Sequence, residues 1–92
     1  MSTASFETVW ARIVSLEGDT FTQIRGRFRD FTFRRQGNTL HLSSTNQAIS
    51  RSQWAMAFEM VPLNSTIPVQ HLRAPSYIYA ILMDPRVRKN DW

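Results

Sequence analysis

Two short runs of alternating apolar and polar residues on either side of a glycine constrain the fold of this 92-residue chain more than any other feature. The first run is Phe-Thr-Phe-Arg at 31–34, and the second is Thr-Leu-His-Leu at 39–42, with Gly37 between them. A period of two is typical of strands with one buried face, and a glycine between two such runs is typical of a tight turn. The sequence therefore predicts a β-hairpin.

The position of the turn sets the register of this hairpin. A two-residue turn at Gln36-Gly37 pairs Phe33 with Leu40, while a turn one residue later keeps the same two faces. In either case the phenylalanines and leucines share one face, and Arg34 and His41 lie together on the other. The separation of an apolar face from a basic face is thus predicted independently of the register.

Three other segments have the features of helices. Between Ser5, a residue suited to an N-cap, and Gly18, a residue suited to a terminator, apolar residues follow a helical stripe. Ser50 and Gln53 have the spacing of a capping box and predict the start of a second helix. The apolar run at 77–83 suits a short buried helix or a central strand, and the helix is favoured because a proline precedes it.

Together these elements predict an α+β fold. Its expected parts are an N-terminal helix, a three-stranded antiparallel sheet, and then one long and one short helix packed on one face of the sheet. The strands are expected at 20–25, 28–35 and 38–43. We expect one small domain over residues 1–92, with a C-terminal tail at about 86–92 that frays unless Trp92 docks.

The composition limits which kinds of site this chain can build. It contains no cysteine, so neither a disulfide nor a zinc thiolate site can stabilise its small core. Its two histidines, His41 and His71, lack metal-ligand spacing, and we expect no metal and no cofactor. No apolar run reaches the roughly 18 residues that span a bilayer, so a cytoplasmic location is expected.

Positive charge is concentrated in one segment, 25–35, which holds five arginines and one aspartate. That surplus equals the net charge of +4 of the whole chain, and it indicates an anionic partner such as DNA or RNA. A polar loop leading to the second helix offers further contacts, because a helix N-terminus favours anions. The predicted nucleic-acid-binding residues are Arg25, Arg27, Arg29, Arg34, Arg35, His41, Asn46, Gln47 and Arg51.

Residue parity adds a condition to this hypothesis. Arg25, Arg27 and Arg29 have the same parity as the core residues Phe31 and Phe33, so an unbroken strand would bury their charges. A bend or bulge is therefore expected, either at Gly26 or at the Arg29-Asp30 step. Phe28, which has the opposite parity, is the phenylalanine that could stack on a base.

These observations favour a small basic nucleic-acid-binding protein without catalytic activity. A dimer is also expected, because a small chain can bury apolar residues such as Met56, Met60 and Leu63 between two copies. One alternative is a protein-interaction or homo-oligomerisation module of an accessory system. In that case the arginines are solvated or paired with carboxylates such as Glu17. A third hypothesis is a metal-free ribonuclease that uses His41 beside Arg34.

Overall fold

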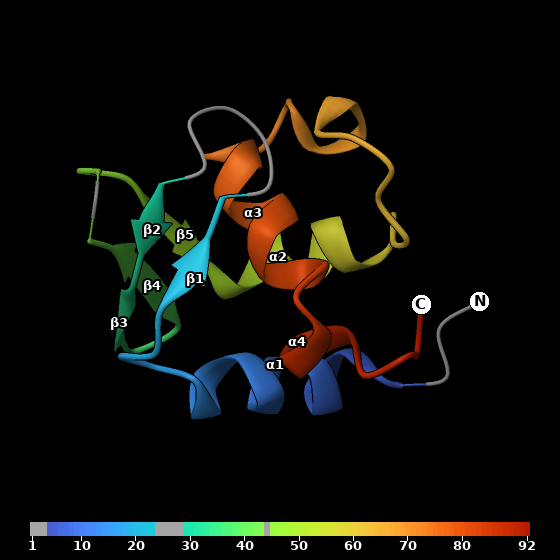
Figure 1. Ribbon diagram of the computed structural model, residues 1–92, viewed down its shortest axis with the longest axis horizontal. Helices are drawn as coiled ribbons and strands as arrows, with labels where there is room; N and C mark the ends of the chain where they lie inside the picture. Colours follow the sequence, from blue (N-terminus) through green and yellow to red (C-terminus); the bar gives the residue numbers. More distant parts are fainter. Residues whose placement is uncertain (1–3, 24–28, 44) are drawn as a thin grey trace.

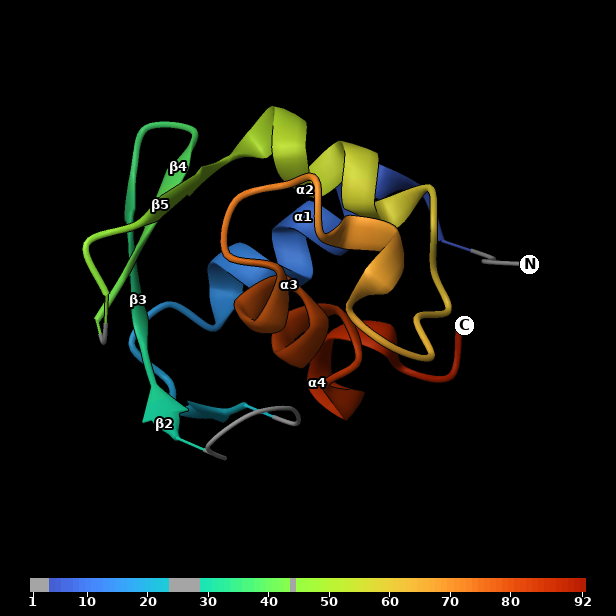
Figure 2. The ribbon, with the colours of Figure 1, turned by 90° about the horizontal axis from the view of Figure 1, so that it is seen from above.

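The computed structural model describes residues 4–23, 29–43 and 45–92 and has the predicted α+β architecture. Helices gather on one side of the strands, and the outer side of the strands carries no helix (Figures 1 and 2). The elements are, in chain order, α1 (Phe6–Ser15), β1 (Phe21–Thr22), β2 (Asp30–Phe31), β3 (Phe33–Gln36), β4 (Thr39–Leu42), β5 (Ala48–Ser50), α2 (Arg51–Phe58), the 3-10 helix η1 (Ile67–Val69), α3 (Pro75–Leu82) and α4 (Pro85–Arg88).

The predicted hairpin is formed by β3 and β4, with the turn at Gly37-Asn38. Phe33 lies opposite Leu42, so the predicted pairing of Phe33 with Leu40 is wrong. The turn lies one residue later in the chain than Gln36-Gly37. Gly37 has a φ of 62°, and a two-residue turn with Gly at its first central position matches the twist of an antiparallel pair. The predicted faces are confirmed, because the phenylalanine and the leucines are buried and Arg34 and His41 are exposed.

The third strand of this sheet is β5 and not the segment at 20–25. The sheet has the order β3-β4-β5, while β1 pairs with β2 in a separate two-stranded sheet that brings Phe21 opposite Phe31. Strand β5 is only three residues long, with Ile49 buried between two half-buried neighbours. A strand this short shows almost no alternation of apolar and polar residues. The sequence therefore predicted a helix, and no strand, after the polar loop.

Helix α1 begins as predicted at Ser5, whose hydroxyl oxygen accepts a hydrogen bond from the backbone N–H of Thr8. The start of α2 after Ser50 is also confirmed, but the capping box is wrong. The Ser50 hydroxyl lies 3.0 Å from the hydroxyl of Ser52, and Gln53 Oε1 instead accepts a hydrogen bond of 2.8 Å from the backbone N–H of Arg73. A contact with a distant loop has replaced the local one.

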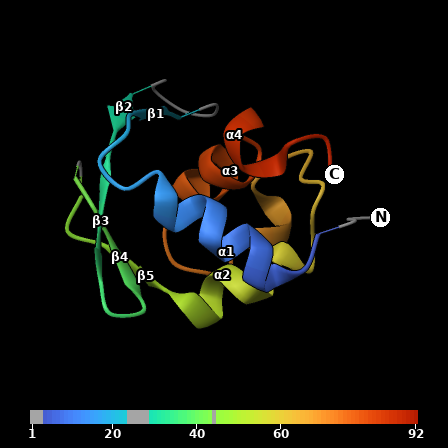
Figure 3. The same ribbon diagram turned by 90° about the horizontal axis from the view of Figure 1, so that it is seen from below.

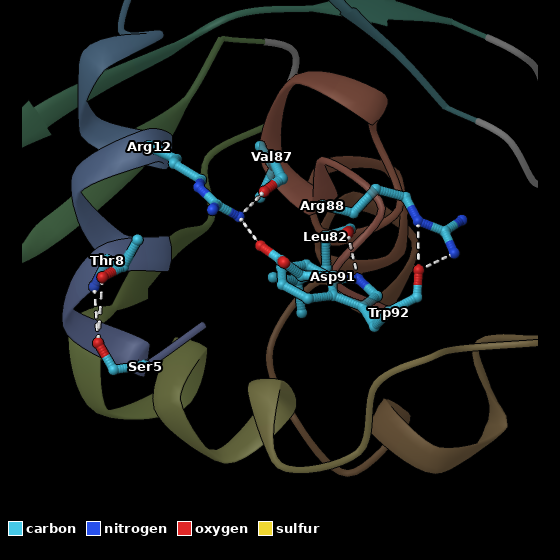
Figure 4. Close-up of polar contacts among 8 residues, drawn as sticks. All are labelled: Ser5, Thr8, Arg12, Leu82, Val87, Arg88, Asp91 and Trp92. Atoms are coloured by element: carbon cyan, nitrogen blue, oxygen red, sulfur yellow. Dashed lines mark hydrogen bonds and ion pairs between the residues drawn. The ribbon is translucent and has the colours of Figure 1, made fainter. Parts of the chain in front are cut away.

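The C-terminal residues pack on the helices (Figure 4). The indole Nε1 of Trp92 donates a hydrogen bond of 2.9 Å to the carbonyl of Leu82, and its ring meets Phe58 edge-on. Arg12 of α1 bonds the carbonyl of Val87 and forms an ion pair with Asp91. Trp92 therefore docks on the helices, which is the condition under which the tail was expected not to fray.

The remaining apolar run forms α3, as favoured, and residues 78–82 are all buried. Its side chains fill the core between the strands and α1, α2 and α4, so the apolar face of the sheet is covered. None of the helices in the described ranges has both the length and the apolar character needed to cross a bilayer.

Candidate nucleic-acid interface

The outer face of the β3–β4–β5 sheet carries polar side chains from all three strands. The register aligns side chains across the three strands in rows. One row contains Arg34, His41 and Ala48, and the next contains Gln36, Thr39 and Ser50. Because alternate residues point to opposite faces of a strand, both rows lie on the face away from Phe33 and Ile49. Among the described residues, no helix lies over this face in Figures 1 and 2.

An open pocket of about 540 Å³ lies at the β3 side of this face. Its lining residues are Glu17, Arg34, Arg35, Gln36 and His41. The pocket thus combines two guanidinium groups, an imidazole, an amide and a carboxylate. This set contains donors for an anionic oxygen together with groups that can exchange protons.

Glu17 reaches the pocket because the segment after α1 runs along the free edge of β3 (Figure 3). The backbone N–H of Gly18 donates to the carbonyl of Phe33 at 3.3 Å, and the backbone N–H of Arg35 donates to Glu17 Oε2 at 2.7 Å. These contacts satisfy backbone groups that an edge strand otherwise leaves open. They also fix one carboxylate oxygen of Glu17 beside the two arginines.

The arginines of the pocket remain available for a ligand. Arg35 uses Nε to bond the carbonyl of Gly37 at 2.8 Å, which holds its guanidinium near the turn. Within the described ranges, no residue forms an ion pair or a side-chain hydrogen bond with the guanidinium of Arg34. The same is true of Arg29.

Elsewhere in the described part of the chain, three arginines are bound to carboxylates. The ion pairs join Arg12 with Asp91, Arg51 with Glu7, and Arg86 with Asp84. The hydrogen bonds that the Arg86 guanidinium donates to Asp84, and the negative charge of Asp84, raise the pKa of Arg86, whose guanidinium also lies over the ring of Phe21. The charges of these three arginines are therefore compensated locally, whereas Arg34 and Arg29 form no ion pair with a described residue.

Several predicted site residues are brought together. Arg34, Arg35 and His41 share the pocket, and Arg34 lies directly opposite His41 on the neighbouring strand. Arg29 is exposed just before β2, which begins at Asp30, and its backbone carbonyl accepts a hydrogen bond of 3.0 Å from the backbone N–H of Gln23. Arg25, Arg27, Gly26 and Phe28 lie outside the described residues.

The predicted grouping at the start of α2 is not formed. Asn46 and Gln47 are exposed in the β4–β5 connection, whereas the backbone of Arg51 bonds Asn38 at the opposite end of β5. The Arg51 guanidinium turns to Glu7 and lies 5.1 Å from the centroid of the Phe6 ring. It therefore joins α2 to α1. Strand β5 thus separates Arg51 from Asn46 and Gln47, which stay predicted contacts on their own.

Sequence reasoning missed Glu17 and Gln36 as residues of the site. From the sequence, Glu17 was expected only as a carboxylate that neutralises an arginine, because no local pattern links it to a strand that begins at Phe33. Gln36 could have been found from the hairpin register, because it shares the face of Arg34 once the turn is placed at Gly37-Asn38. Glu17 joins the site only through tertiary contacts. The place of Gln36 depends on the register of the hairpin, which the sequence left open by one residue.

The described residues contain no group of three or more histidine, cysteine, aspartate or glutamate side chains that could hold a metal ion. Comparisons with known protein families, with curated proteins and with solved structures find no match to this chain. A functional hypothesis must therefore be based on the chemistry of the site.

Proposed function

We propose that this protein binds nucleic acid through the outer face of the β3–β4–β5 sheet. The observation that carries the proposal is that Arg34, opposite His41, faces an open pocket and forms no ion pair with any described residue, while three other arginines are held in ion pairs. An exposed guanidinium offers paired donors to a phosphate, and a neighbouring arginine and imidazole increase the attraction.

The shape of the surface favours a strand with exposed backbone over a compact anion. The rows of side chains cross neighbouring strands that lie about 4.8 Å apart, so the polar groups extend across the sheet rather than around a single point. Gln36, Thr39 and Ser50 supply uncharged hydrogen-bonding groups in the row beside Arg34. Contacts of this kind position a strand through its backbone and leave base recognition to few groups.

The interaction-module alternative has weaker support. Among the described residues, the large apolar side chains that are exposed are Met56 and Ile67, whereas Leu63 is buried and Met60 is half-buried. Such scattered apolar exposure is ordinary for a monomer. The dimer stays a prediction that light scattering tests, and a cytoplasmic location stays part of the proposal.

Chemical-shift mapping on the ¹⁵N-labelled protein tests the proposed surface. Titration with a single-stranded RNA or a duplex DNA at low salt is expected to shift the backbone amides of Arg34, Gln36 and His41. The indole signals of Trp54 and Trp92 report on the helical side and are expected to stay in place, since both rings are buried away from the outer face. Absence of any shift, or shifts confined to α3 and α4, would contradict the proposal.

A further inference from the structure

We propose that the pocket at the β3 edge not only binds but also cleaves RNA, with Glu17 as general base and His41 as general acid. This inference depends on the proposed nucleic-acid binding and assigns the pocket a substrate class, single-stranded RNA. It is carried by a carboxylate, two guanidinium groups and an imidazole that line one open pocket. The sequence alone placed only Arg34 and His41 together.

The order of these groups across the sheet suits cleavage of a phosphodiester. Glu17 is held at the free edge of β3, Arg34 is on β3 itself, and His41 lies opposite Arg34 on β4. Neighbouring strands are about 4.8 Å apart, so Arg34 lies between the edge that holds Glu17 and the strand that carries His41. An in-line displacement at phosphorus requires a base on one side and an acid on the other.

Glu17 is both held in place and free to react. Its Oε2 accepts the hydrogen bond from the backbone N–H of Arg35, which orients the carboxylate. Within the described ranges no residue bonds its Oε1. One oxygen is therefore used for positioning, and the other can accept a proton from the substrate.

The proposed step balances without a cofactor. Glu17 removes the proton of the ribose 2′-hydroxyl, and the 2′-oxygen attacks the adjacent phosphorus. The bond from phosphorus to the 5′-oxygen breaks while protonated His41 gives its proton to that oxygen. The products are a 2′,3′-cyclic phosphate and a 5′-hydroxyl end, and the proton on Glu17 returns to His41 through solvent.

The guanidinium groups supply the electrostatic part of this step. Negative charge grows on the non-bridging oxygens as phosphorus becomes five-coordinate, and fixed cations stabilise that charge more than they stabilise the ground state. Arg35 is pre-oriented by its bond to Gly37, and Arg34 has no competing partner among the described residues. DNA lacks the 2′-hydroxyl, so it can bind to the same face but cannot be cleaved by this route.

The test compares a 5′-fluorescent single-stranded RNA with the same sequence as 2′-O-methyl RNA. Binding is measured by anisotropy and cleavage by gel, with the cyclic phosphate identified by mass spectrometry. The variants are Glu17→Gln, whose amide oxygen can still accept from Arg35, and His41→Asn. Matched controls are Glu59→Gln and His71→Asn, which alter an exposed glutamate and an exposed histidine outside the pocket.

We expect wild type to cut RNA and to bind the 2′-O-methyl strand without cutting it. Glu17→Gln and His41→Asn are expected to bind the 2′-O-methyl strand within about threefold of wild type and to cut RNA about 100-fold more slowly, the lower end of general acid–base effects. Both controls should cut at the wild-type rate. RNA that is bound but stays intact, or is cut equally well by either pocket variant, overturns cleavage and leaves binding in place. No binding of either strand overturns the proposed function itself.

Discussion

Replacing Arg34 and Arg35 by alanine is expected to make nucleic-acid binding much less sensitive to salt. Each phosphate neutralised on a single strand releases counterions and contributes about −0.7 to the slope of log affinity against log salt. Three described cations on the sheet side can contribute: Arg29 and Arg34, which have no ion pair, and Arg35 in the pocket. The wild-type slope from these three is thus about −2, and the double variant keeps about −0.7.

Between 50 and 200 mM salt, these slopes correspond to an affinity loss of about 20-fold for wild type and about threefold for the double variant. Arg25 and Arg27 lie outside the described residues and would add equally to both proteins. The difference between the two slopes, about 1.4, is therefore the quantity to measure. Fluorescence anisotropy with 2′-O-methyl RNA at several salt concentrations measures it without interference from cleavage.

A variant with the same net charge separates placement from overall charge. Arg73→Ala combined with Lys89→Ala also removes two exposed cations, but neither lines the pocket. This control is expected to keep the wild-type slope. If both double variants flatten the slope equally, only net charge matters. If the Arg34 and Arg35 variant keeps the wild-type slope, the outer face is not the binding surface.

Three stability predictions are measured by urea denaturation. Trp92→Ala is expected to cost about 3 kcal/mol, because it removes a buried ring and its hydrogen bond to Leu82, and an unchanged midpoint would show that the tail does not dock. Gly37→Ala is expected to cost about 1 kcal/mol from its φ of 62° alone, since an added Cβ meets no atom within 4 Å. Lys89→Gly is expected to gain about 1 kcal/mol, because Lys89 has a φ of 45°, and a loss would contradict strain there.

Local sequence patterns predicted those parts of the fold that depend on residues close in the chain. The start of α1 at Ser5 and the helix after Pro75 follow from capping and proline rules, and α2 begins after Ser50 as predicted although the capping box is not formed. The two faces of the hairpin follow from alternation around Gly37. Each of these features depends on fewer than about a dozen consecutive residues, the range over which periodicity is readable.

Contacts between distant segments escaped prediction for the same physical reason. The third strand of the main sheet is β5, because a three-residue strand gains its stability from β4 and from burial of Ile49 rather than from its own propensity. Gln53 does not form the predicted capping box, because its Oε1 accepts a hydrogen bond from the backbone N–H of Arg73, twenty residues away. Propensity at one position was outweighed by hydrogen bonds that only the folded chain provides.

The candidate site also contains features that the sequence predicts and features that only tertiary contacts create. The sequence by itself determined that Arg34 and His41 share an exposed face, since alternation of side chains across a hairpin fixes which residues are neighbours. Only the tertiary structure decided that Arg51 is bound by Glu7 while Arg34 is left available, and that Glu17 enters the pocket. These outcomes depend on where α1 and its following segment pack against the sheet, and the burial of the whole core sets that position.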